Sequence, residues 1–170
     1  MKSIVSASHE KQAMPPMSGE PMDSDGLEAR VRAVHANKLK LCADLEAIAD
    51  SLPDDVDPKM CLAMARALPQ ILARAHSLEN DELFPFLLML RPGDKNLAAS
   101  LERLRYEHWE DESYSEEVSS ELLDCAMCTS RRTADATGYL LRGFFEGLRR
   151  HIAFEQEHIL PMISEARKLS

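Results

Sequence analysis

Apolar residues recur along most of this chain at alternating steps of three and four. Between about Gly26 and Leu52 they form a seam around Lys38, made of Leu27, Val31, Val34, Leu41, Leu45, Ile48 and Leu52. This spacing places side chains on one face of an α-helix. Similar patterns predict three further helices, from Pro58 to about Leu90, from Lys95 to about Cys128, and from about Ala134 to Lys168.

Turn residues separate the four predicted helices. Pro53 and two aspartates end the first helix, Arg91-Pro92-Gly93-Asp94 forms a turn before the third, and a short linker at 129–133 precedes the fourth. Asp94 is a suitable N-cap, and Pro69 and Pro85 are expected to kink the second helix. Long helices with short connections predict an all-α, antiparallel up-down four-helix bundle.

The predicted helices leave the first residues of the chain outside the bundle. Residues 1–24 contain Ser, Pro, Met and Gly without a periodic apolar pattern. Such a composition is typical of disorder. We therefore expect a disordered N-terminal tail at 1–24 and one helical metal-binding domain at 25–170.

Composition excludes some classes of partner. The net charge of −9 opposes nucleic-acid binding, and the basic pairs Arg131-Arg132 and Arg149-Arg150 stand isolated in an acidic chain. No apolar run is long enough to span a membrane, and the N-terminus lacks the apolar core of a secretory signal. We expect a cytoplasmic protein that binds neither nucleic acid nor membranes, with its cysteines, Cys125-x-x-Cys128 included, as free thiols.

Ionisable residues interrupt the apolar seams near the middle of the helices. They are His35 in the first helix, His76 and Glu79 in the second, His108, Asp111 and Glu112 in the third, and His151, Glu155 and His158 in the fourth. Buried carboxylates without partners cost several kcal/mol each, so the fold needs a reason to keep them. A lone seam histidine is often hydrogen-bonded in a core, but three helices with such interruptions indicate a metal cage.

The chemical types of the candidate ligands limit which metal the site would bind. Imidazoles and carboxylates without a thiolate favour iron or manganese over a structural zinc, although zinc stays an alternative. A ferritin-like di-iron site is a rival cage, but it requires Glu-x-x-His on each of two helices. The chain matches that pattern at Glu155-Gln-Glu-His158, which leaves the second pair missing.

The spacing of these residues resembles the hemerythrin-like (HHE cation-binding) family over about residues 26–169. Two phrases carry most of the resemblance: Glu79-Asn-Asp-Glu-Leu-Phe-Pro85 in the second helix, and His151-Ile-Ala-Phe-Glu-Gln-Glu-His-Ile-Leu-Pro161 in the fourth. In both, a glutamate precedes the proline by six residues. The resemblance implies an antiparallel bundle that holds two non-haem irons bridged by an oxygen atom and two carboxylates.

The resemblance also implies roles for particular residues. His35, His76, His108 and His151 would be terminal imidazole ligands, and Glu79 and Glu155 would be the bridging carboxylates.

Three features depart from the family pattern. The second helix has His-x-x-Glu instead of His-x-x-x-Glu, so Asn80 occupies the expected carboxylate position. The third helix has His108-x-x-x-Glu112, where oxygen carriers have two histidines, and His158 is an extra candidate ligand. As a harder anionic ligand, Glu112 would stabilise the ferric state, which favours sensing or iron chemistry over oxygen storage.

Three kinds of function fit these observations. The first is a metal-binding protein that senses or handles oxygen, nitric oxide or iron. The second is an enzyme, such as a di-iron oxidase or peroxidase. The third is a metal-free helical module for protein interactions. A homodimer through an exposed helix face is compatible with all three.

Overall fold

A computed structural model describes residues 24–167, with side chains as far as residue 165. The predicted tail at 1–24 therefore lies outside the described residues, except for Ser24, which begins the first helix. His9 and the methionines of the tail lie outside them too.

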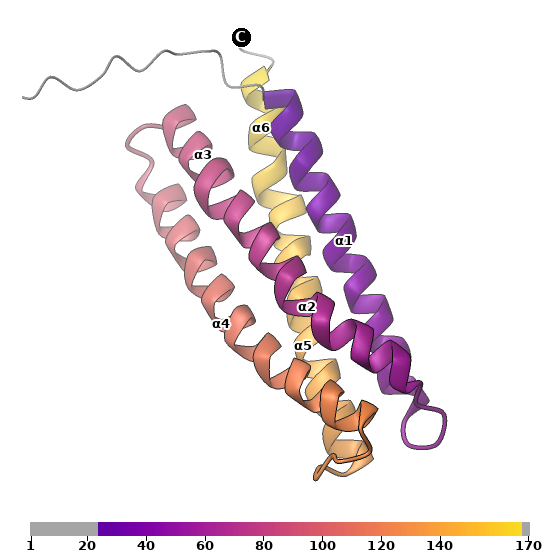
Figure 1. The fold of residues 1–170 in the computed structure, drawn as a ribbon. Coiled ribbons are helices and arrows are strands. Elements are labelled where there is room, and N and C mark those ends of the chain that lie inside the picture. Colours follow the sequence, from indigo (N-terminus) through magenta and orange to yellow (C-terminus); the bar gives the residue numbers. More distant parts are fainter. Residues whose placement is uncertain (1–23, 168–170) are drawn as a thin grey trace, which may run out of the picture.

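The described chain is helical apart from the connections at 52–57, 91–94 and 127–133, and residues 24–167 contain no strand. The helices are α1 (Ser24–Ser51), α2 (Pro58–Leu78), α3 (Phe84–Leu90), α4 (Lys95–Ala126), α5 (Ala134–Phe154) and α6 (Leu160–Arg167). Two π-helical turns, η1 (Glu79–Leu83) and η2 (Glu155–Ile159), join α2 to α3 and α5 to α6. Figure 1 shows α1 and α4 running in one direction and the two composite helices in the other, which confirms the predicted up-down bundle.

Side chains at the helix starts explain why the helices begin there. The Asp57 carboxylate accepts a hydrogen bond from the Lys59 backbone N–H, directly before Pro58 at the first helical position. Asp94, the predicted N-cap, accepts from the backbone N–H groups of Asn96 and Leu97. Thr133 caps α5 in the same way. Each of these caps ends a short connection from the preceding helix, and such short connections hold consecutive helices antiparallel.

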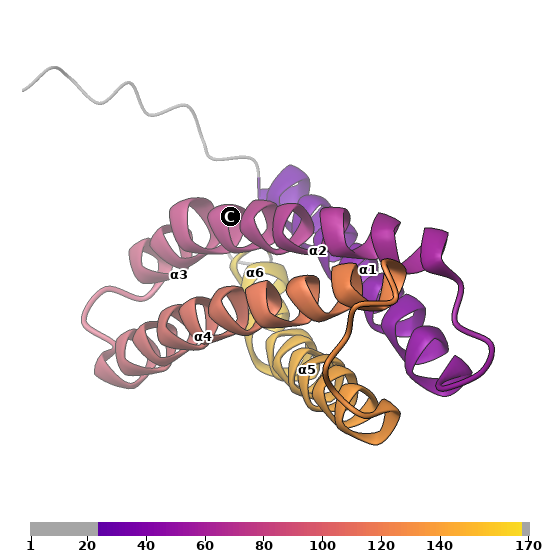
Figure 2. The same ribbon diagram turned by 60° about the horizontal axis from the view of Figure 1, so that its bottom comes forward.

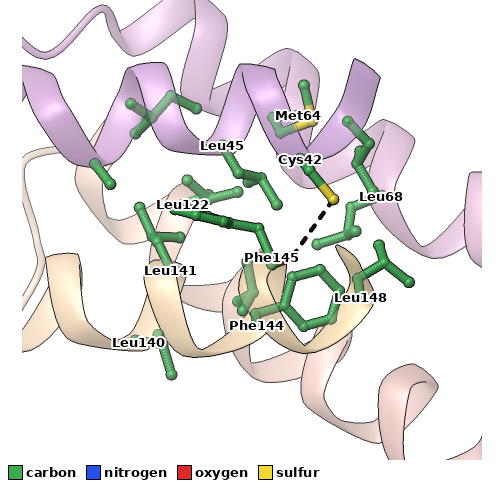
Figure 3. Close-up of a cluster of buried hydrophobic side chains, with 14 of the residues drawn as sticks. Cys42, Leu45, Met64, Leu68, Leu122, Leu140, Leu141, Phe144, Phe145 and Leu148 are labelled. Carbon is green, nitrogen blue, oxygen red and sulfur yellow. Dashed lines mark hydrogen bonds between the residues drawn. The ribbon is translucent and has the colours of Figure 1, made fainter. Parts of the chain in front are cut away.

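Two buried apolar clusters fill the bundle within residues 24–165. One lies toward the α1–α2 and α4–α5 connections, and the other toward α3, α6 and the start of α4. Figure 3 shows the first cluster, where Leu45, Leu122, Phe144 and Phe145 point into the space between the helices. Helix α2 packs against α4, and α1 against α5 (Figure 2). Among the described helices, none is long and apolar enough to cross a membrane.

A buried carboxylate, Glu121, fixes the connection between α4 and α5. Its Oε1 accepts hydrogen bonds from Thr137 Oγ1 at 2.6 Å and Ser130 Oγ at 2.7 Å, and from the Cys125 thiol at 3.7 Å. Arg132 Nε lies 3.2 Å from Oε2. Burial raises the pKa of Glu121, but these hydrogen bonds and the Arg132 charge outweigh it and lower the pKa. The ionised carboxylate therefore stabilises the turn.

Glu121→Gln should lower the free energy of unfolding by about 1–3 kcal/mol at neutral pH, because the hydroxyl groups lose a charged acceptor. The folded pKa lies below the unfolded value of about 4.3, so the wild-type advantage is lost as the pH falls through the folded pKa. Urea unfolding at neutral and acid pH measures both effects. The exposed Glu116→Gln on the same helix is the control; an equal loss in both variants would contradict this account.

Candidate metal centre

A polar layer crosses the bundle between the two apolar clusters. Each of the long helices contributes to it, and all its side chains are buried. The members of this polar layer are His35, Lys38, His76, Glu79, His108, His151 and Glu155. Residues of one cluster precede these positions on each helix and residues of the other follow them. The layer is therefore sealed from both ends of the bundle by apolar packing.

The two π-helical turns begin at the two glutamates of the polar layer. The backbone N–H of Phe84 bonds to the carbonyl of Glu79, and that of Leu160 bonds to the carbonyl of Glu155. Each bond spans five residues instead of four. Such turns insert one extra residue into a helix and are common at functional sites.

Pro85, six residues after Glu79, leaves a backbone acceptor free in the first π turn. In π geometry residue 85 would donate to the carbonyl of Asn80, but proline has no N–H. Arg105 Nη2 donates to that carbonyl instead, at 3.0 Å. The Asn80 side chain then faces α4, where its Oδ1 lies 3.0 Å from His108 Nδ1.

Two histidine rings are oriented by hydrogen bonds on their Nδ1 side. His108 Nδ1 bonds to Asn80 Oδ1, and His76 Nδ1 lies 2.8 Å from Glu112 Oε1. A carboxylate oxygen or amide oxygen can only accept, so Nδ1 carries a proton, which leaves Nε2 of the neutral ring with its lone pair. Burial lowers the pKa of His76 to about 2, which keeps its ring neutral. Histidines that bind metals are usually held in this way.

Ring packing restrains the same histidines further. The His76 and His108 rings stack with centroids 4.1 Å apart and planes 9° from parallel. Phe84 stacks on the other side of His108 at 5.6 Å, and the Arg105 guanidinium covers Phe84 at 5.5 Å. The inward direction of the two Nε2 atoms is thus fixed by the fold.

Lys38 enters the polar layer from α1 and is completely buried. Its ammonium donates to Glu79 Oε1 at 2.8 Å and to Glu155 Oε2 at 3.4 Å. His35 Nε2 lies 3.0 Å from the same Glu155 oxygen. Burial raises the pKa of Glu155, but the Lys38 charge and the contacts with His151 and His35 together outweigh it and lower the pKa to about 2. One oxygen of each glutamate is therefore satisfied by a buried cation.

The other oxygen of each glutamate faces a histidine nitrogen. Glu79 Oε2 lies 3.1 Å from His108 Nε2, and Glu155 Oε1 lies 3.6 Å from His151 Nε2. Among the described residues these four atoms are buried and have no hydrogen-bond partner. We call Glu79, His108, His151 and Glu155 the ligand group. Each offers one ligand atom, and the four atoms lie within 4.8 Å of one another. Four buried ligand atoms this close together can share one bound cation, which would replace the hydrogen bonds that they lack.

A cavity opens beside His151 of the ligand group. It has a volume of about 390 Å³ and is lined by Arg103, Glu107, Glu110, Asp111, Gly147, Arg150, His151 and Phe154. At its inner end, His151 Nδ1 lies 3.3 Å from Glu107 Oε2 and 3.9 Å from Asp111 Oδ2. A small ion or molecule can reach His151 by this route.

The structure places two candidate ligands outside the cage, which corrects the sequence-based expectation for both. The Glu112 carboxylate hydrogen-bonds to His76 Nδ1, the ring nitrogen that points away from the ligand group. Glu112 lies one turn after His108 on α4, where that helix faces α2. The predicted ferric preference from direct Glu112 ligation therefore loses its basis. The His158 side chain is 51% exposed and packs on Phe154. The π turn shifts the buried face after Glu155 by one residue, to Ile159 and Ile163.

Sequence reasoning missed two members of the site. Lys38 occupies a core position of the first seam and lies three residues after His35, so a charged residue at that position was the available signal. Asn80 was noticed as a departure from the family spacing, but its bond to His108 depends on the π turn. His35 and His76, which the sequence predicts as ligands, are buried in the polar layer next to the ligand group.

A comparison with known families agrees with the site and the fold. The description "Hemerythrin HHE cation binding domain" matches residues 27–163. None of the curated proteins and none of the solved structures compared matches the chain. Because the match covers most of the chain, the protein belongs to the hemerythrin HHE cation-binding domain family.

Lys38→Met should destabilise the metal-free protein by about 3–5 kcal/mol, because it leaves two buried carboxylates without their cation. Urea unfolding in the presence of a chelator measures the change. Lys40→Met on the same helix is the control, since Lys40 forms an exposed pair with Asp44 worth about 0–1 kcal/mol. Similar stabilities for the two variants would show that Lys38 does not compensate the glutamates.

Proposed function

We propose that this protein binds a non-haem metal ion through Glu79, His108, His151 and Glu155, and that it senses or handles oxygen, nitric oxide or iron. The observation that supports this most is the buried group of Glu79, His108, His151 and Glu155, whose ligand atoms lie within 4.8 Å of one another. A cation between them would satisfy atoms that find no partner within the described chain. The family membership supports the same reading.

The chemistry of the donor set favours iron. Two imidazoles and two carboxylates, without a thiolate, suit iron or manganese, and histidine–carboxylate sites with open positions are typical of non-haem iron. Zinc stays an alternative metal. Bound iron would supply redox chemistry and a free coordination position for a small ligand. The residues of the chain would orient the ion and exclude bulk water.

The surroundings of the ligand group suit a small ligand better than a bulky substrate. Apolar clusters close the polar layer from both ends. The cavity beside His151 has a volume of about 390 Å³, and its lining contains three acidic residues, Glu107, Glu110 and Asp111, besides Arg103 and Arg150. Its acidic groups would attract a metal cation, and its size would admit a diatomic molecule.

An oxidase or peroxidase is the second candidate function. It would use the same ligand group. A metal-free interaction module is less well supported, because it gives no role to the four buried ligand atoms that lie together without hydrogen-bond partners.

Metal analysis of the purified protein tests the proposal. Wild-type protein loaded with ferrous iron and then desalted should retain iron. His108→Ala should lose most of it, because a ligand is removed. His158→Ala should retain it, because that ring lies outside the cage. Retention of iron by His108→Ala, or its absence from the wild type, would contradict the proposal.

Spectra and turnover of the same samples separate the two candidate functions. A sensing or handling protein should change its absorption spectrum when azide or nitric oxide is added, without consuming peroxide. Steady turnover of peroxide that His108→Ala abolishes would instead favour the enzyme.

A further inference from the structure

The position of Lys38 bears on the number of metal ions. In a centre of two bridged ions, each bridging carboxylate gives one oxygen to each ion. Glu79 and Glu155 are the expected bridging carboxylates, but one oxygen of each already accepts a hydrogen bond from Lys38 Nζ. The two carboxylates therefore have different neighbours on their two sides.

The two sides of the carboxylate pair can be described separately. On one side, Glu79 Oε1 and Glu155 Oε2 contact the Lys38 ammonium at 2.8 Å and 3.4 Å. On the other side, Glu79 Oε2 and Glu155 Oε1 face His108 and His151. Among residues with described side chains, the second pair of oxygens has no hydrogen-bond partner, whereas the first pair has.

A metal ion on the Lys38 side would compete with the ammonium for the same space. Transition-metal ions lie about 2 Å from their carboxylate ligands, and an ion that close to Glu79 Oε1 and Glu155 Oε2 would collide with Lys38 Nζ. The side chain has nowhere to retreat without moving the core, because it is completely buried between Leu41 and His35 along α1. Close packing resists such a shift.

Charge leads to the same conclusion. The two glutamates carry two negative charges, of which Lys38 balances one. One divalent ion at the ligand group would leave the polar layer with a single positive charge, which a bound anion can neutralise. A second divalent ion would leave three positive charges in a dry interior, which is unfavourable.

We propose that the Lys38 ammonium takes the place of the second cation, so that the protein binds one metal ion instead of two. This inference rests on the proposed metal-binding function. Lys38 is then a built-in counter-ion that keeps both carboxylates ionised and directs the metal to the His108 and His151 side. His35, which contacts Glu155 at 3.0 Å, supports the Lys38 side and is not a ligand.

The proposal narrows the chemistry of the centre. A single iron that cycles between ferrous and ferric states exchanges one electron. Reduction of dioxygen by two electrons within one site would require a second iron. Binding of nitric oxide, or of iron itself, requires one ion, and these roles therefore fit the proposal better than reversible oxygen carriage.

The test is the number of iron ions per chain in wild type, Lys38→Met and Lys40→Met, each loaded anaerobically with excess ferrous iron and desalted. We expect one ion in the wild type and in Lys40→Met. We expect two in Lys38→Met, because His35, His76 and the released oxygens of Glu79 and Glu155 become available. Two ions in the wild type, or one in Lys38→Met, would overturn the role of Lys38 while leaving metal binding intact. No bound iron in the wild type would instead overturn the proposed function.

A spectroscopic measurement on the wild type covers the case in which Lys38→Met does not fold. After oxidation, an isolated high-spin ferric ion gives an electron paramagnetic resonance signal that accounts for all the bound iron. An oxygen-bridged ferric pair couples to a silent ground state. A full-intensity signal supports the single ion, and bound iron without a signal overturns it.

Discussion

The structure depends on keeping two ionised carboxylates, Glu79 and Glu155, in the middle of an apolar bundle. Burial of such charges is expensive unless they are paired and hydrogen-bonded. Lys38 compensates one oxygen of each, and the remaining oxygens face histidine nitrogens. The apolar clusters on both sides increase the cost of any unpaired charge, because they exclude the water that would otherwise solvate the polar layer. Metal binding is the simplest way to complete the compensation.

Local backbone features place these groups. The π turns begin at the two glutamates, and a proline follows each glutamate after six residues. The second and fourth helices therefore place their carboxylates by the same backbone feature. On the second helix, Pro85 frees a carbonyl for Arg105, and the Asn80 side chain orients His108. Stacking on Phe84 and His76 restrains the same ring. The inward lone pair of His108 is therefore a product of the helix irregularity and of packing together.

The sequence predicted the helices closely because their signals are local: seams of apolar residues, turn residues between them, and the cap Asp94. It also predicted which histidines and glutamates reach the middle of the core, apart from His158 and Glu112. The error at His158 has one cause, since a regular helix was assumed where an extra residue rotates the chain beyond Glu155. Glu112 and Lys38 were harder to place, because their partners come from other helices: His76 for one, Glu79 and Glu155 for the other. Helical periodicity gives the face of a residue but not the atom it contacts.

The central claim is that the polar layer is completed by one cation on the side opposite Lys38. Anomalous X-ray diffraction from crystals of the iron-loaded protein, measured at the iron absorption edge, tests it directly. The account predicts a single anomalous peak bounded by Glu79 Oε2, His108 Nε2, His151 Nε2 and Glu155 Oε1, with Lys38 still bonded to the other oxygens. The absence of a peak at this position, or a second peak at the position of Lys38 Nζ, would contradict it.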